Sequence, residues 1–340
     1  MDILEFAQCM PKAELHVHLE GSILPHTLIK LAQHNHVTLP ANDEAGLVEF
    51  YRFRNFEQFL NTYMTITGCL RTPDDYRLIA YEFGCECARQ NIRYAEVTFT
   101  ILTNMSMTGL SWWDILAGLN SGRQQAYTDF GVRWQWVFDI VRNLPDTQKS
   151  VLDIALSARE MGVISLGLGG LEEGFPPELF VDTFAQAEEH HLHRVPHAGE
   201  IGGPQSVWSA IKLLHAERIG HGVRSIEDPL LVDYLKANNI PLEICPTSNI
   251  CLNVYPDYAH HPLRKLWDAG LKLTVNTDDP PMFGTDLNHE YQVLVNHFNF
   301  NRSDLEQISQ NAIRASFLSQ EEKQILLHEF QDEFIKLETM

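Results

Sequence analysis

Cysteine is scarce in this chain, which has six in 340 residues. No two of them have the C-x-x-C spacing of a thiolate zinc site. So few cysteines in so long a chain favour reduced thiols over a disulfide framework. The N-terminal residues lack the basic region and apolar run of a secretory signal, and no stretch of about 20 residues is continuously apolar. We therefore expect a cytoplasmic protein without a membrane span.

Positive charge is also in short supply. Lysine and arginine together number 25 against 45 aspartates and glutamates, which gives a formal net charge of −20. A surface this acidic repels phosphate backbones and anionic membranes, so nucleic acid and membranes are not expected partners. The apolar fraction of 44% is ordinary for a globular protein with a large core.

No internal repeat or low-complexity linker divides the chain. Short β-type runs alternate instead with amphipathic helical stretches such as 76–89, 147–160, 205–216 and 227–238. The runs lie at 13–18, 92–99, 132–139, 163–169, 193–197, 217–221, 240–245 and 271–277. Alternation of this kind indicates parallel strands joined by right-handed crossovers, and eight such units close into a barrel. We predict an α/β protein with a (β/α)8 TIM barrel that spans residues 1–340 as a single domain.

Residues 54–70 form a helical stretch that a plain crossover between the first two strands does not need. Phe56, Phe59, Leu60 and Tyr63 follow the i, i+3, i+4, i+7 pattern of an amphipathic helix. For most of these side chains, packing on the barrel explains the pattern. For Phe56 we predict a place in an apolar lid over the barrel mouth. At the other end of the chain, residues 319–338 indicate a polar, solvated helix.

Unusual polar residues fall at the ends of the predicted strands, where barrels carry their active sites. His16 and His18 flank Val17, and the two-residue period of a strand points both imidazoles the same way. Two histidines in this spacing are a weak signal alone. His197 ends the fifth predicted strand, with Glu200 three residues later, and His221 ends the sixth between two glycines.

The eighth predicted strand ends in Asn276-Thr277-Asp278-Asp279-Pro280. An N-cap ahead of Pro280 would explain one aspartate but not both. Two adjacent carboxylates after an apolar strand need a cation or hydrogen-bond donors. Three histidines and one aspartate at strand ends suit zinc or another late divalent metal, with zinc favoured for hydrolysis.

Four segments together resemble the adenosine/adenine deaminase family of the amidohydrolase superfamily. They are Pro11–Gly21 (PKAELHVHLEG), His197–Glu200 (HAGE), Glu217–Val223 (ERIGHGV) and Val275–Pro280 (VNTDDP), in the order of the family over roughly residues 10–320. The resemblance implies a hydrolase that replaces the 6-amino group of a purine with oxygen.

The resemblance also assigns a role to each matched position. It implies that His16, His18, His197 and Asp278 hold one zinc ion per chain. It implies that Glu200 protonates purine N1, that His221 orients and deprotonates the water, that Asp279 meets N7, and that the Gly170 N–H meets N3. Superfamily barrels with two metals carry a bridging lysine at the end of strand four. This chain has Gly167-Leu168-Gly169-Gly170 there, which favours one metal.

The choice among 6-aminopurines depends on four positions. Thr277 and Gly170 match the adenosine deaminases of the family. Glu20 replaces the aspartate that those enzymes place near the ribose 5′-hydroxyl, and the adenine enzymes share this glutamate. Thr98 replaces an arginine that is common in adenosine deaminases. We expect adenosine, together with 2′-deoxyadenosine, as the first interpretation, with 6-aminodeoxyfutalosine second and free adenine third. The oligomeric state stays open.

Overall fold

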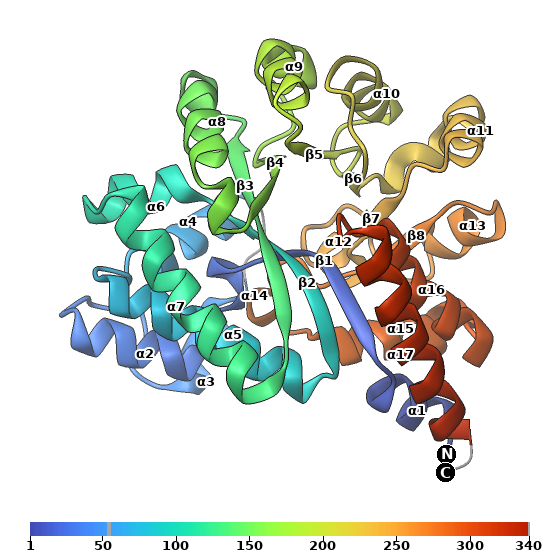
Figure 1. The fold of residues 1–340 in the computed structure, drawn as a ribbon, viewed down its shortest axis with the longest axis horizontal. Coiled ribbons are helices and arrows are strands. Elements are labelled where there is room, and N and C mark those ends of the chain that lie inside the picture. Colours follow the sequence, from blue (N-terminus) through green and yellow to red (C-terminus); the bar gives the residue numbers. More distant parts are fainter. Residues whose placement is uncertain (53–55, 339–340) are drawn as a thin grey trace.

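The computed structural model describes residues 1–52 and 56–338, except for the side chain of Phe56. Its centre is an eight-stranded sheet in the order β1-β2-β3-β4-β5-β6-β7-β8, in which each strand pairs in parallel with the next (Figure 1). An isolated parallel bridge between Val17 and Asp278 joins the two ends of the sheet. The predicted (β/α)8 barrel is therefore confirmed. The strands are β1 Lys12–His18, β2 Ile92–Phe99, β3 Arg133–Val141, β4 Val163–Gly169, β5 His193–Ala198, β6 Ile219–His221, β7 Leu242–Ile244 and β8 Leu273–Val275.

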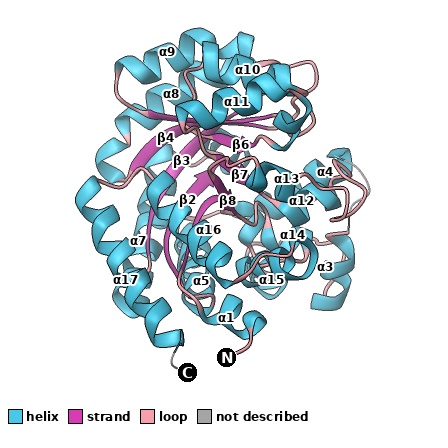
Figure 2. Ribbon diagram, turned by 90° about the vertical axis from the view of Figure 1, so that its right-hand side faces the viewer, coloured by secondary structure: helices cyan, strands magenta, loops and turns pink. Residues whose placement is uncertain are grey.

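Helices surround the strands (Figure 2). The α-helices are α1 Ile3–Cys9, α2 Pro25–His34, α3 Glu44–Phe50, α4 Phe56–Thr67, α5 Pro73–Arg89, α6 Ile101–Thr108, α7 Trp112–Phe130, α8 Gln148–Ser157, α9 Val181–Glu189, α10 Pro204–Leu213, α11 Pro229–Asn238, α12 Pro246–Cys251, α13 Leu263–Asp268, α14 Pro280–Phe283, α15 Leu287–Phe298, α16 Arg302–Ala315 and α17 Gln320–Glu338. Short 3-10 turns are η1 Glu20–Ser22, η2 Pro145–Thr147, η3 Arg159–Met161, η4 Pro177–Phe180 and η5 Val223–Glu227.

The last three strands are shorter than the sequence predicts. Each has three residues, whereas the apolar runs extend over 217–221, 240–245 and 271–277. Main-chain hydrogen bonds continue past these bounds, from the Glu217 N–H to the Arg194 carbonyl at 3.0 Å and from the Asn276 N–H to the Ile244 carbonyl at 2.9 Å, and side chains bind there as well. Glu217 pairs with His193, and the Thr277 N–H donates to Glu14 at 2.9 Å. The apolar runs in the sequence therefore extend beyond the residues that have the full hydrogen-bond pattern of a strand.

The segment between β1 and β2 carries the predicted lid. The Phe59 ring in α4 stacks on Phe283 with centroids 5.8 Å apart, and the Tyr63 hydroxyl lies 3.2 Å from Thr100 Oγ1. Phe59, Leu60 and Tyr63 all line the central cavity. These are side chains that the helical pattern alone assigned to packing, so more of α4 covers the mouth than expected. The Phe56 side chain lies outside the described residues, and its lid role stays a prediction.

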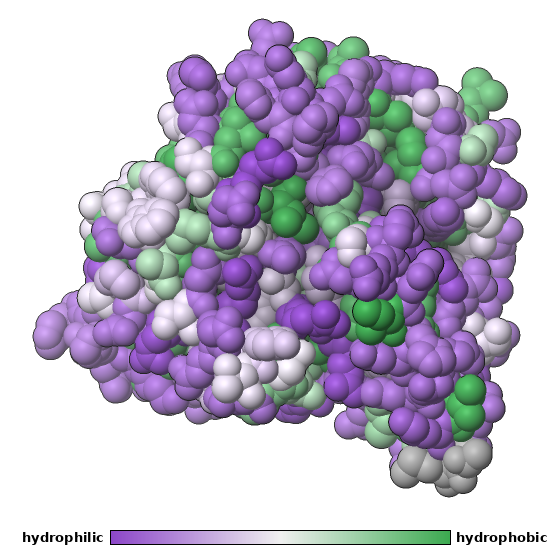
Figure 3. Space-filling model, viewed as in Figure 1, coloured by the Kyte–Doolittle hydropathy of each residue, from purple (hydrophilic) through white to green (hydrophobic). Residues whose placement is uncertain are grey.

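The C-terminal helix α17 corrects the prediction of a solvated helix. Leu326, Phe330 and Phe334 are buried at four-residue spacing, and Phe334 packs on Phe6 of α1 with centroids 6.2 Å apart. The charged residues between them hid this narrow apolar stripe. Hydrophilic residues cover most of the face seen in Figure 3, with apolar residues in separate patches. No helix within the described residues has the length and apolar character that crossing a membrane requires.

A buried ion-pair network joins three strands inside the barrel. The Arg218 guanidinium, just before β6, bonds to Glu96 of β2 and lies 2.6 Å from Glu243 of β7. It also donates to the Ala315 carbonyl at 2.9 Å and lies 3.9 Å from the centre of the Phe317 ring. Buried charges persist only when they are paired. Arg218 is therefore the cation that Glu96 and Glu243 share in this part of the described core.

Replacing Arg218 tests this dependence. The Arg218→Met variant leaves Glu96 and Glu243 buried without their cation, so we expect a loss of about 3–5 kcal/mol in the free energy of unfolding. Urea unfolding followed by tryptophan fluorescence measures it. Arg314→Met, on the exposed face of α16, is the control and should change stability by no more than about 0.5 kcal/mol. Equal stability of the two variants would show that the network is dispensable.

Candidate active site

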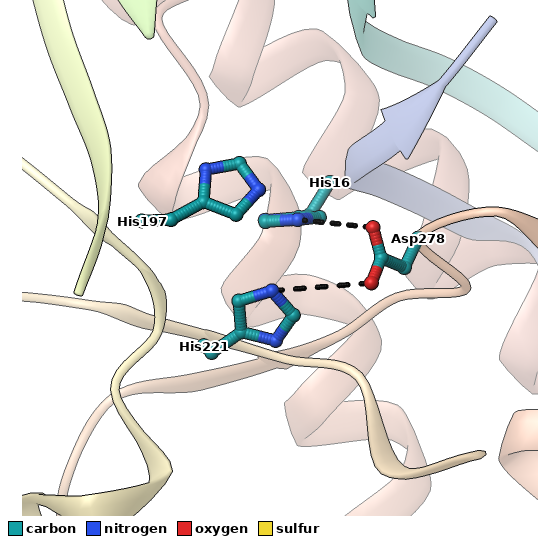
Figure 4. A group of neighbouring side chains, drawn as sticks. All are labelled: His16, His197, His221 and Asp278. Carbon is teal, nitrogen blue, oxygen red and sulfur yellow. Dashed lines mark ion pairs between the residues drawn. The ribbon is translucent and has the colours of Figure 1, made fainter. Parts of the chain in front are cut away.

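The polar residues predicted at strand ends meet at one end of the barrel. His16 and His18 end β1, His197 and His221 lie at the ends of β5 and β6, and Asp278 follows β8. Four of these residues form a group whose nitrogen and carboxylate atoms lie within 4.8 Å of one another: His16, His197, His221 and Asp278 (Figure 4). The structure therefore gathers in one place residues that are up to 262 positions apart in the sequence.

Asp278 lies at the centre of the histidines. Its Oδ1 is 3.5 Å from His16 Nε2 and 3.4 Å from His18 Nε2, and its Oδ2 is 3.9 Å from His221 Nε2. The quartet expected from the sequence contains His18 and leaves out His221. In the structure His18 falls in a second group, with Asp278 and Asp279, and His221 in the first. Asp278 is common to both groups.

The donor set fits a late divalent metal such as zinc. Among the described residues, His16 Nε2 and His197 Nδ1 are buried and lack hydrogen-bond partners. Buried nitrogens of this kind are costly unless something binds them. Imidazole nitrogens and a carboxylate are ligands that zinc accepts, and the combination is typical of catalytic sites.

Residues behind the group fix its orientation. Glu243 accepts a hydrogen bond at 3.0 Å from His16 Nδ1, which leaves His16 Nε2 to face the group. The Ser248 hydroxyl donates to Asp278 Oδ2 at 2.7 Å, and the Asn249 amide nitrogen lies 3.3 Å from His221 Nδ1. Carboxylate support of a ligating histidine is a regular feature of metal sites.

Two residues of the site have an unusual backbone conformation. His221 has φ 61° and Asp278 has φ 68°, in the left-handed region that non-glycine residues rarely adopt. Such conformations cost about 1–3 kcal/mol each and persist where the surroundings over-determine them. The isolated bridge from Asp278 to Val17 is part of that constraint.

The two adjacent aspartates have opposite electrostatic character. Burial alone would raise the pKa of Asp278, but His16 and His221 hold that pKa well below its usual value. Burial and the charge of Asp278 raise the pKa of Asp279 well above its usual value. Within the described residues, the Asp279 side chain makes no capping hydrogen bond at α14, although its position is the N-cap. Helix capping therefore explains neither carboxylate.

Gly21 leaves the space that Asp279 occupies. A Cβ built on Gly21 would lie 1.7 Å from Asp279 Oδ1. Any side chain at this position would push the carboxyl group away from the cavity. The final glycine of the first matched segment is therefore explained by close packing.

Glu200 is a buried carboxyl group that faces the same cavity. Its Oε1 lies 3.6 Å from His221 Nε2, and it has no hydrogen-bond partner among the described residues. Burial, followed by the negative charges of Asp278 and Glu172, raises the pKa of Glu200 to about 8. Burial and the positive charge of His16 lower the pKa of His221 to about 4. At neutral pH this pair therefore consists of a protonated carboxyl and a neutral imidazole.

A cavity of about 440 Å³ opens from the histidine group. Near the group its walls include His18, Gly170, His197, Glu200, His221, Asp278 and Asp279. The remaining walls come mainly from α4, α6 and residues 141–151. Most of their side chains are apolar, and the polar residues Thr103, Ser106, Asn143 and Thr147 lie among them; the apolar ones include Leu60, Met64, Leu102, Met107, Leu144 and Val151. The cavity thus has a polar end and an apolar end.

Glu20 lies behind the cavity wall. Its Oε1 accepts hydrogen bonds from the Thr100 N–H at 3.1 Å and the Asn104 amide at 2.7 Å. Burial raises the pKa of Glu20 to about 7. These contacts anchor the N-terminal end of α6, which supplies part of the apolar wall. Thr98, the other position that differs from adenosine deaminases, is buried in β2.

Sequence reasoning missed two buried acids near the cavity. Asp139 lines the cavity from β3, and burial raises its pKa. Glu172 follows β4 and binds the loop that carries Glu200. Asp139 ends a predicted strand, so its position was a usable signal. Glu172 had no such signal, because its partners are main-chain groups.

Known proteins are similar in sequence to this chain over most of its length. The family model described as adenosine deaminase matches residues 11–333. An aminodeoxyfutalosine deaminase from Streptomyces coelicolor is 40% identical over 323 residues, which cover 93% of this chain and 82% of the relative. An adenine deaminase from Cupriavidus necator is 35% identical over 320 residues, covering 94% of this chain and 91% of that protein.

A solved structure of a similar protein contains zinc. The amidohydrolase from Burkholderia ambifaria, crystallised with bound zinc, has a TM-score of 0.91 and 28% identity, with 100% of this chain and 95% of that chain covered. The matched region includes every strand end described above. This chain belongs to the adenosine deaminase family, and it is an enzyme of the deaminase type, a hydrolase that acts on C–N bonds.

Proposed function

We propose that this enzyme deaminates a 6-aminopurine nucleoside that carries an additional group at its 5′ end, of which 6-aminodeoxyfutalosine is the model. Water replaces the 6-amino group, and the products are the 6-oxopurine and ammonia. The observation that carries this proposal is the single cavity that continues from the histidine group to an apolar chamber. The 40% identity to the Streptomyces coelicolor enzyme supports the same substrate.

The polar end of the cavity suits the purine base. Asp279, protonated because of its raised pKa, can donate a hydrogen bond to N7, which is an acceptor. We assign the backbone N–H of Gly170 to N3. These two contacts would place C6 next to the histidine group.

We assign one zinc ion to His16, His18, His197 and Asp278. Zinc would supply a water of lowered pKa, and therefore a nucleophile at neutral pH. His221, which is neutral and buried, would orient that water toward C6 and accept its proton. The shared position of Asp278 in both groups of ligand atoms supports its assignment.

Glu200 would deliver a proton to purine N1. Attack at C6 places electron density on N1, where a proton must be delivered in the transition state. A carboxyl group with a pKa near 8 still holds that proton at neutral pH. Its buried position beside His221 keeps it within the same cavity as the reacting atoms.

The whole cavity, at about 440 Å³, is larger than a free base requires. The whole cavity lies within the range of about 300–1,000 Å³ that is usual for drug-sized ligands. Leu102 and Met107 of α6 line it together with Leu144 and Val151. Burial of the apolar part of the 5′ substituent against these side chains would add binding energy far from the reacting carbon.

Free adenine is the second candidate. The 35% identity to the adenine deaminase of Cupriavidus necator favours it, as does Glu20. Adenosine, the first expectation from the sequence, would fill the polar end and leave the apolar chamber to water. We therefore rank it below the extended nucleoside.

Metal analysis and metal removal test the assignment of one zinc ion per chain. The purified protein should contain about one zinc per chain, and dialysis against a chelator should abolish deamination until zinc is added back. Atomic absorption gives the metal content, and ammonia release gives the activity. Two tightly bound metals per active chain, or full activity of the metal-free protein, would contradict the assignment.

Glu200→Gln tests the proton donor. Gln retains the size of the side chain but cannot give up the proton, so kcat should fall on the order of 10²-fold or more while zinc is retained. Glu189→Gln on the exposed face of α9 is the matched control and should keep full activity. Near-normal kcat of the zinc-loaded Glu200→Gln enzyme would remove Glu200 from the mechanism.

A substrate panel tests the role of the apolar chamber. We expect kcat/KM for 6-aminodeoxyfutalosine to exceed that for adenosine and for adenine by at least about tenfold, or roughly 1.4 kcal/mol. Met107→Trp should fill the chamber and lower that preference, with little effect on adenine. Leu230→Trp, at a side chain that is 74% exposed, is the control. Adenine preferred over every nucleoside would place this enzyme among nucleobase deaminases.

A further inference from the structure

The loop that carries Glu200 surrounds a second buried carboxylate. The backbone N–H groups of four consecutive residues, 199–202, all donate to Glu172. Gly199 donates to Oε1 at 2.7 Å, and the other three donate to Oε2 at 3.2, 2.9 and 2.6 Å. The Ser206 hydroxyl of α10 also donates to Oε1. Converging main-chain N–H groups form an anion-binding concavity, and here a side chain of the protein fills it.

The surroundings keep Glu172 ionised. Burial raises the pKa of Glu172, but the Ser206 hydrogen bond and the positive charge of Arg142 outweigh it and hold that pKa below its usual value. Arg142 is itself buried and donates to the Phe175 carbonyl at 2.9 Å and to the His197 carbonyl. It therefore connects the loop of Glu172 with the end of β5.

Gly202 shows how closely the carboxylate is held. A Cβ built on Gly202 would lie 2.7 Å from both Cδ and Oε1 of Glu172. A Cβ on its neighbour Gly203 would meet no described atom closer than Arg224 Nη2, at 3.9 Å. The close approach is thus specific to the residue that donates the shortest backbone hydrogen bond in the group.

We propose that Glu172 is a positioning residue that sets the location of the Glu200 carboxyl group by binding the main chain of residues 199–202. Glu172 lies two residues after Gly170, so it also fixes the distance between the loop of the N3 donor and the loop of the N1 donor. Glu172 does not touch the substrate. This inference rests on the proposed role of Glu200 in proton transfer.

Removal of the carboxylate should act mainly on kcat. Glu172→Ala leaves the N–H groups of the loop without an acceptor, so Glu200 loses its fixed position while the apolar chamber is unchanged. Misplacement by about 1 Å can cost on the order of 10²-fold in rate. We expect kcat to fall at least about tenfold with KM changed less than about threefold, and with zinc content intact. Glu173→Gln, at the adjacent exposed glutamate, is the control and should behave as the unmodified enzyme.

Sodium formate separates positioning from general destabilisation. Formate is a small carboxylate that fits the concavity vacated in Glu172→Ala, so it should restore kcat in a saturable way, whereas sodium chloride at equal ionic strength should not. Gly202→Ala offers a second route, because its methyl group displaces the Glu172 carboxylate without removing the charge. We expect the same loss of kcat there, without formate rescue, and no loss in Gly203→Ala.

The double variant Glu172→Ala/Glu200→Gln decides whether Glu172 acts through Glu200. If it does, Glu172→Ala lowers kcat less than about twofold when Glu200→Gln is already present. An equal loss in both backgrounds, or full kcat in Glu172→Ala, overturns the inference and leaves the proposed function in place. Full kcat in Glu200→Gln overturns the proposed role of Glu200 and the inference with it.

Discussion

A chain of buried charges through the barrel is the constraint on which the site depends. It runs from Glu96 of β2 through Arg218 and Glu243 to His16, and from there to Asp278 after β8. Each member is buried, and each is tolerable only because its neighbour compensates it. Removal of one member leaves the next without a partner, so the chain couples the stability of the core to the orientation of His16. The Glu243 carboxylate joins the core to the site, because one oxygen faces Arg218 and the other faces His16 Nδ1.

Neighbouring charges also shift the pKa values of the two adjacent aspartates in opposite directions. The imidazoles around Asp278 lower its pKa, whereas burial and the neighbouring charge of Asp278 raise the pKa of Asp279. Under the proposed function, two adjacent carboxyl groups would thus provide an anionic acceptor for a metal and a hydrogen-bond donor for the base. Glu200 and His221 are a second pair of this kind, with a protonated acid beside a neutral imidazole. Pairs of titratable groups whose environments push their pKa values apart are the mark of acid–base chemistry.

The sequence predicted the barrel and the residues at its strand ends because periodicity and strand-end position are local signals. The two-residue period placed His16 and His18 on one side, and strand ends brought His197, His221 and Asp278 to the same face. The bounds of β6, β7 and β8 could not be predicted, because they depend on which main-chain groups of neighbouring strands come into register, and no local signal encodes that. Glu172 and Glu243 were also out of reach. Their partners are a distant main-chain loop and a distant histidine, and no spacing within the sequence encodes either contact.

The two ends of the cavity are formed by parts of the fold that tolerate substitution to different degrees. Its polar end is built from strand ends whose residues contact the buried ion pairs or the Glu172 carboxylate. Substitutions there therefore disturb several partners at once. Its apolar end comes from α4, α6 and the start of α8, where side chains such as Met64 and Met107 contribute packing alone. Changes in apolar volume there cost little stability when the cavity can absorb them. Under the proposed function, relatives that keep the same polar end can therefore differ in the group attached to the base, and helices that take no part in the chemistry would decide substrate preference.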